Sequence, residues 1–187
     1  MTEFVAGGRR RIDRVLAPEY LDGLHELTLT EVRERRAEAD QEEVDLSYAR
    51  RLLHGRIDIL RHEQHRRAEG GPAAPAPGTL GDEAIVEALK RILADDRPAD
   101  RGLGRHMTAT PSRVGEHRRE AERAVADVGG SDLAGMDDDA LAQALARLAD
   151  IEARVSRSRR QVQAVVDTLT ADIARRYSTD RLTVTEV

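Results

Sequence analysis

Two long stretches of this chain carry an apolar residue at every seventh position, and this periodicity constrains the fold more than any other feature. The two series are Val32, Ala39, Leu46, Leu53 and Leu60, and then Leu141, Leu148, Val155, Val162 and Leu169. Apolar residues at heptad spacing are typical of the seam of a coiled coil. We therefore predict an all-α protein with two long coiled-coil helices, over residues 28–69 and 137–178.

Composition supports this prediction and excludes several classes of protein. The 187 residues include one Phe, three Tyr and no Trp, which is little material for the core of a β-sandwich or a doubly wound α/β fold. The absence of Cys excludes disulfides and thiolate zinc sites. A net charge of −5 argues against direct DNA binding, and no apolar stretch approaches the roughly 18 residues of a membrane span. We expect a soluble, cytoplasmic protein.

Local signals mark where the two long helices begin. Thr28 and Glu31 have the spacing of a capping box before the first helix. Residues 137–139 are three Asp, which favour the positive N-terminal end of the second helix. Three consecutive carboxylates also suggest a metal site, but they fan out around a helix axis, so we interpret them as capping residues. We expect residues 1–27 to form a separate N-terminal segment and residues 179–187 to be a frayed tail.

Residues 70–136 are predicted to connect the two long helices. The connection begins with a Pro/Ala/Gly linker over 70–78. A short amphipathic helix is expected over about 81–96, with an apolar face of Ile85, Val86, Leu89, Ile92 and Leu93. A more polar helix is expected from Thr110–Pro111 to about Val128, with a weak apolar face of Val114, Ala121, Val125 and Val128.

An offset of 109 residues relates the two heptad series and also relates two sets of polar residues. Copy 1 of this motif consists of Glu43, Ser47, Arg50, His54 and Asp58, and copy 2 of Glu152, Ser156, Arg159, Gln163 and Asp167. At about 100° per residue, each copy forms a stripe about 80° wide beside the apolar seam. A charged flank of a coiled coil is the ordinary explanation for one such stripe. Because the same pattern occurs twice, we interpret the stripes as a ligand-binding site.

The residue types of the motif suit a guanine nucleotide. Arg offers two parallel donors that match O6 and N7 of guanine, and Asp or Glu accepts from its N1–H and N2–H₂ groups. Ser, His and Gln reach phosphates or ribose hydroxyls. Two copies on antiparallel helices would be related by a pseudo-twofold axis, which suits a twofold-symmetric guanine ligand. Because the stripes carry Glu and Asp, we expect uncompensated charge and looser helices when no ligand is bound.

With these two motif copies, the chain resembles the RsiG family, cyclic di-GMP-dependent anti-sigma factors that restrain the WhiG sigma factor in sporulating actinomycetes. His54 departs from the Gln of the family motif. The resemblance implies an antiparallel two-helix coiled coil whose ten motif residues bind cyclic di-GMP as a stacked pair of molecules. It also implies that the loaded protein sequesters a WhiG-type sigma factor and represses sporulation-associated transcription.

The alternative function is that of a structural coiled coil without a ligand. An enzyme finds little support, because the sequence lacks G-x-S-x-G, Walker, G-x-G-x-x-G and H-E-x-x-H motifs. His62, Glu63 and His65 suggest a metal cluster, but they lie at the solvated end of the first helix, and we predict no metal site. We predict that the sigma factor contacts the apolar face within residues 85–93 and the ends of the long helices.

Overall fold

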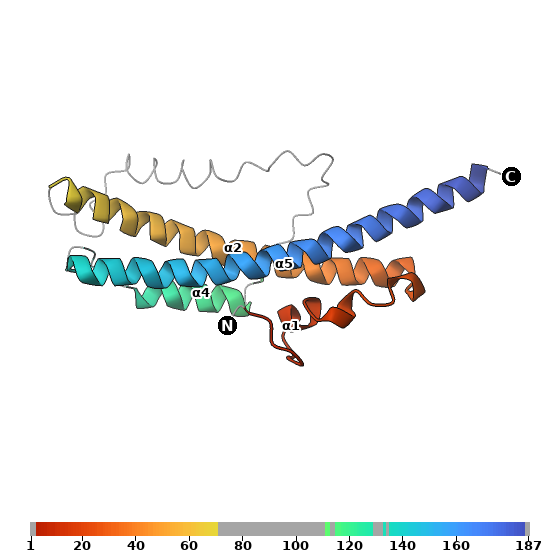
Figure 1. Cartoon of the computed structure of the whole chain (residues 1–187), viewed down its shortest axis with the longest axis horizontal. Coiled ribbons are helices and arrows are strands. Elements are labelled where there is room, and N and C mark those ends of the chain that lie inside the picture. Colours follow the sequence, from red (N-terminus) through yellow and green to blue (C-terminus); the bar gives the residue numbers. More distant parts are fainter. Residues whose placement is uncertain (1–2, 71–110, 113–114, 129–132, 134, 186–187) are drawn as a thin grey trace. The chain divides into compact units, whose positions relative to one another are not determined.

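The computed structural model describes residues 3–70, 111–112, 115–128, 133 and 135–185, and all regular structure within these ranges is helical (Figure 1). The elements are α1 (Arg11–Val15), the 3₁₀ helices η1 (Pro18–Tyr20) and η2 (Leu24–Glu26), and the α-helices α2 (Leu29–Ala68), α4 (Glu116–Asp127) and α5 (Asp138–Thr185). The predicted all-α fold with two long helices is confirmed.

The chain divides into two compact units, and each long helix contributes to both. Unit 1 consists of Met1–Arg50, Ala109–Glu120 and Ala153–Val187. Unit 2 consists of Arg51–Thr108 and Ala121–Glu152. The N-terminal elements α1, η1 and η2 therefore belong to unit 1.

The two long helices run in opposite directions within each unit. In unit 1, Arg176 donates to the carbonyl of Leu27 (2.7 Å) and Gln163 donates to Glu43 (3.3 Å). In unit 2, the side chain of Glu152 lies 2.9 Å from that of His54, and Arg67 donates to Asp138 (2.9 Å). Residue numbers rise along α2 as they fall along α5, so the predicted antiparallel packing is confirmed.

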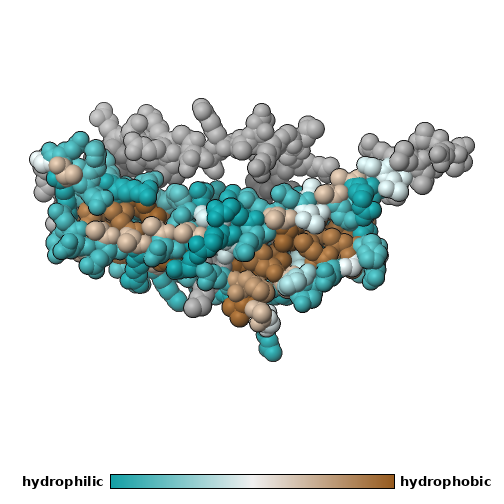
Figure 2. Space-filling model, in the orientation of Figure 1, coloured by the Kyte–Doolittle hydropathy of each residue, from teal (hydrophilic) through white to brown (hydrophobic). Residues whose placement is uncertain are grey.

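The heptad residues form the core of both units, as the sequence predicts. None of the ten residues of the two series is more than 1% exposed, and Ile57 beside them is 4% exposed. Full burial of a Leu or Val side chain contributes about 1.5–3 kcal/mol. In Figure 2 hydrophobic surface gathers in strips between hydrophilic residues. Packing along the seams therefore holds the helices of each unit together.

Polar contacts define the ends of the long helices. The Thr28 N–H donates to Glu31 (2.7 Å) and the Glu31 N–H donates to Thr28 Oγ1 (3.3 Å), so the predicted capping box is present. Asp137 accepts the N–H of Ala140 (2.7 Å) and thus caps α5, as we predicted. After α2, Gly70 has a φ of 68°, a left-handed conformation that favours glycine.

The prediction of a frayed tail from residue 179 is wrong, because α5 continues to Thr185. No Gly or Pro occurs between residues 179 and 185, so nothing in the sequence ends the helix there. None of the described helices is long and apolar enough to cross a membrane.

The predicted start of the polar helix is also wrong. The helix begins at Glu116 rather than at Pro111, because the Ser112 N–H donates to Asp45 (2.7 Å) and Gly115 supplies the carbonyl that accepts the Arg119 N–H (3.2 Å). Its buried face includes Ala124 (5% exposed) in place of the expected Val125. Three predicted features lie outside the described residues: the linker over 71–78, the helix over 81–96 and the apolar face of that helix.

Candidate functional site

In unit 1 the motif residues form a network between α2 and α5. The carboxylate of Glu43 accepts hydrogen bonds from Ser47 Oγ (2.8 Å), Arg159 Nε (3.0 Å) and Gln163 Nε2 (3.3 Å). Arg159 Nε also donates to Ser47 Oγ (2.9 Å). The side chains of Glu43 and Arg159 are 22% and 27% exposed. This network therefore joins the two motif copies while staying accessible to solvent.

Unit 2 contains the equivalent contact of the other copy. The offset of 109 residues relates Glu152 to Glu43 and Gln163 to His54. His54 Nε2 lies 2.9 Å from Glu152 Oε1, just as Gln163 pairs with Glu43 in unit 1. In both units the glutamate of one copy thus pairs with the fourth residue of the other copy. Imidazole replaces the carboxamide of Gln without loss of this contact.

The remaining motif residues differ in solvent exposure. Arg50 and Ser156, both in unit 1, are partly buried. The two aspartates are exposed, Asp167 in unit 1 and Asp58 in unit 2. Asp58 lies 3.9 Å from Arg61. Exposed carboxylates at these positions remain available to accept hydrogen bonds from a ligand.

The expected uncompensated charge is not observed on Glu43, and both motif glutamates have a polar partner. Glu43 forms an ion pair with Arg159, and Glu152 pairs with His54. Each glutamate finds its partner on the opposite helix because the antiparallel register brings the start of one motif copy beside the later part of the other. Our expectation considered each stripe alone and was wrong on this point.

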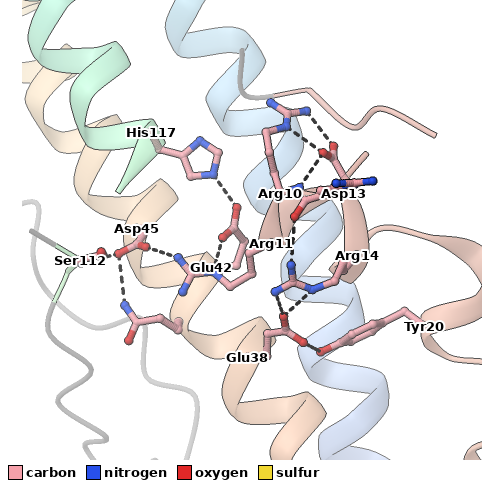
Figure 3. Close-up of polar contacts among 12 residues, drawn as sticks. Arg10, Arg11, Asp13, Arg14, Tyr20, Glu38, Glu42, Asp45, Ser112 and His117 are labelled. Carbon is pink, nitrogen blue, oxygen red and sulfur yellow. Dashed lines mark hydrogen bonds and ion pairs between the residues drawn. The ribbon is translucent and has the colours of Figure 1, made fainter. Parts of the chain in front are cut away.

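A second polar cluster lies in unit 1 around two buried carboxylates of α2 (Figure 3). Glu42 and Asp45 of α2 are 1% and 2% exposed. Arg11 of α1 donates to both, to Glu42 Oε2 (2.6 Å) and to Asp45 Oδ2 (2.5 Å). His117 of α4 pairs with Glu42, and the Ser112 N–H donates to Asp45. We call Arg11, Glu42, Asp45, Ser112 and His117 the buried cluster.

The partners of Glu42 keep its carboxylate ionised despite burial. Burial alone raises the pKa of Glu42, but hydrogen bonds and charges from His117 and Arg11 outweigh it, so the pKa is lowered. A buried carboxylate without such partners would be strongly destabilising. The buried cluster therefore attaches α1 and α4 to one face of α2.

Asp13 orders the loop that leads into α1. Its carboxylate accepts the N–H of Val5 (2.9 Å) and side-chain hydrogen bonds from Arg10 (2.7 and 2.8 Å). The Arg10 hydrogen bonds lower the pKa of Asp13 to about 2, although burial opposes them. A Cβ added to Gly8 would lie 2.1 Å from Asp13 Oδ2, so this position requires glycine.

Sequence reasoning missed the buried cluster. Glu42 and Asp45 lie outside the heptad series, and their partners are 31 to 75 residues away in the chain. The local signal was the position of His117 one turn before the apolar Ala121, on the face that α4 buries. That spacing identifies a buried histidine but does not identify its partner.

The two candidate metal clusters have other roles. Asp137 caps α5, and Asp138 accepts from Arg67. Glu63 accepts from Arg66 (2.6 Å) and Arg67 (2.6 Å), which lowers its pKa to about 2. Among the described residues no group of three or more His, Cys, Asp and Glu side chains is arranged to hold a metal ion.

The chain belongs to the RsiG-like family, whose model matches residues 18–93 and 127–187. The matched residues include both motif copies and both long helices, whereas α1 and His117 lie outside them. This is a family of regulatory anti-sigma factors rather than enzymes, and membership implies a sigma factor as partner. No curated protein matches the chain.

Proposed function

We propose that this protein is an anti-sigma factor that binds cyclic di-GMP and, when loaded, sequesters a WhiG-type sigma factor and represses sporulation-associated transcription. The observation that carries the proposal is the duplicated E-x3-S-x2-R-x3-(H/Q)-x3-D motif in a chain of the RsiG-like family. The fold supports it, because the motif lies on antiparallel helices and its polar atoms are partly exposed.

Guanine recognition follows from the chemistry of the motif. Arg50 and Arg159 would donate to O6 and N7 of guanine, and the exposed Asp58 and Asp167 would accept from the N1–H and N2–H₂ groups. Ser47, Ser156, His54 and Gln163 would contact phosphates or ribose hydroxyls. Two copies of the motif per chain fit two molecules of a twofold-symmetric dinucleotide.

Ligand binding in this proposal is an exchange of partners. Glu43 now accepts from Arg159 and Gln163, and Glu152 is paired with His54. A guanine edge and a phosphate would take over these donors and acceptors, so the nucleotide would link both helices. Bound nucleotides would then fix the helix spacing and add a surface that the sigma factor contacts.

Calorimetric titration with cyclic di-GMP tests the proposal directly. We expect binding of cyclic di-GMP, many-fold weaker binding of the linear guanine dinucleotide, and weaker binding still of GTP, which has one base. Equal affinity for the cyclic and linear forms would show that the duplicated motif does not read ligand symmetry. A pull-down of the sigma factor should require cyclic di-GMP, and equal capture with and without it would reject the coupling.

The second candidate is a structural coiled coil that acts without a ligand. The pairing of Glu43 with Arg159 and of Glu152 with His54 favours it, because each glutamate already has a polar partner within the chain. This candidate predicts no heat of binding with any guanine nucleotide. The titration above therefore separates the two functions.

A further inference from the structure

Two charged residues precede motif copy 1 on the same stripe of α2. At about 100° per residue, Arg36 and Asp40 lie at about 20° and 60° from Glu43, within the sector that copy 1 itself covers. Both residues belong to unit 1, as does Glu43. The polar stripe is therefore longer on α2 than the repeated motif suggests.

Arg36 and Asp40 are only loosely paired. Arg36 Nη2 lies 3.5 Å from Asp40 Oδ2, and the two side chains are 36% and 23% exposed. Arg36 Nε is buried and has no hydrogen-bond partner among the described residues. A buried donor that lacks a partner destabilises the fold, because it has lost its hydrogen bonds to water. Such an unsatisfied group in a polar stripe is a donor that a ligand can use.

The ionised carboxylate of Asp40 is also poorly stabilised within the chain. Burial raises the pKa of Asp40, and the nearby Glu43 raises it further, while Arg36 only partly opposes these effects. The ionised carboxylate is thus held at a cost to the fold. Hydrogen-bond donors from a ligand would relieve that cost. Perturbed charged groups of this kind are typical of binding sites.

The extension is not repeated on α5. The offset of 109 residues relates Arg36 to Leu145 and Asp40 to Ala149, which cannot form an ion pair. Counting along the antiparallel helices from the Glu43–Gln163 contact, Asp167 lies level with Ala39, next to Asp40. In unit 1 the Arg36–Asp40 pair therefore lies about level with the end of motif copy 2.

We infer that Arg36 and Asp40 form an additional guanine-reading pair, which makes the nucleotide site in unit 1 larger than the repeated motif. This inference rests on the proposed function. Asp40 accepts from the N1–H and N2–H₂ groups of a guanine of bound cyclic di-GMP, and Arg36 donates to its O6 or N7. The two motif copies then contribute unequally, because copy 2 has no such extension on its own helix.

The test compares Arg36→Ala and Asp40→Asn with a matched control in calorimetric titrations with cyclic di-GMP. Each variant should lose about tenfold in affinity, within the range for a guanine contact. The control is Arg175→Ala, which also removes one arginine from an ion pair, here with Asp172. The Arg175 side chain is 63% exposed and lies about 140° around the helix axis from Glu152, outside the motif stripe. The control should bind within about twofold of the wild type.

Thermal unfolding without ligand distinguishes a binding role from a structural one. Asp40→Asn removes an ionised group that burial and Glu43 disfavour, so its melting temperature should equal or exceed that of the wild type while its affinity falls. A lower melting temperature with unchanged affinity would overturn the inference. Arg50→Ala separates the two proposals. If Arg50→Ala weakens cyclic di-GMP binding and Arg36→Ala leaves the affinity unchanged, the motif site stands and the extension is rejected. If the wild type does not bind, the proposed function fails.

Discussion

Glu42 and Glu43 are adjacent in the sequence, yet they belong to two regions of unit 1 that differ in the exposure and the partners of their charged side chains. Glu42 is 1% exposed and is fixed by Arg11 and His117, which come from separate elements. The Glu43 side chain is 22% exposed, and its partners lie on the two motif-bearing helices. One carboxylate is fully engaged within the fold, and the other has partners that a ligand can replace.

This comparison separates, on one helix, charge that is buried within the fold from charge that stays accessible to solvent. A buried carboxylate must keep its partners, because their loss leaves an uncompensated charge in a region of low dielectric. A partly exposed carboxylate loses less when a partner leaves, since water or a ligand takes its place. Substitutions around Glu42 should therefore mainly change the free energy of unfolding, whereas substitutions around Glu43 should mainly change ligand affinity.

Arg11→Met should have the largest effect, on stability. It leaves the carboxylates of Glu42 and Asp45 without their arginine, and we expect a loss of about 3 kcal/mol in the free energy of unfolding. Urea denaturation measures it. Arg14→Met is the matched control, because Arg14 is 54% exposed and pairs with Glu38, and it should cost less than about 1 kcal/mol. Equal losses would contradict the distinction between the faces.

Asp13→Asn should have the next largest effect on stability, and this effect should depend on pH. A pKa lowered from 3.8 to about 2 corresponds to about 2 kcal/mol of stability. Because the folded-state pKa is the lower one, this contribution is present above about pH 4 and is lost as the pH falls towards 2. The variant should lose it at pH 7 and show a flatter acid dependence. Asp22→Asn, at an exposed site, serves as the control.

Arg50→Ala and Arg159→Ala should each weaken cyclic di-GMP binding by about tenfold, or about 1.4 kcal/mol, through loss of a guanine contact. Stability should change by less than about 1 kcal/mol for Arg159→Ala, since the Arg159 side chain is 27% exposed. Titration calorimetry and urea denaturation measure the two quantities. Wild-type affinity in either variant would exclude that arginine from the site.

His54→Gln should have the smallest effect. It makes the two motif copies identical at this position, and Gln163 already shows that a carboxamide can pair with the motif glutamate. We expect affinity within about twofold of the wild type, or slightly higher. Complete loss of binding would mean that the imidazole has a role of its own in nucleotide recognition.

The heptad seam was predictable because it follows a local rule. A heptad residue such as Leu46 is buried whichever helix it faces, so periodicity alone identifies it. The end of α5 was misplaced because residues 179–185 contain no Gly or Pro that would end a helix. The pairing of Glu43 with Gln163 required the antiparallel register, which combines two distant segments. His117 and Arg11 could not be assigned to Glu42 for the same reason.

The crossed pairing of the motif copies has a consequence for how such a chain can change over evolution. Glu43 pairs with Gln163, and Glu152 pairs with His54. In a homodimer of single-motif chains, one mutation would alter both pairs at once. In this duplicated chain a mutation alters one pair and leaves the other as it was. Position 54 already differs from position 163, so the two motif copies encoded in one gene are free to diverge one at a time.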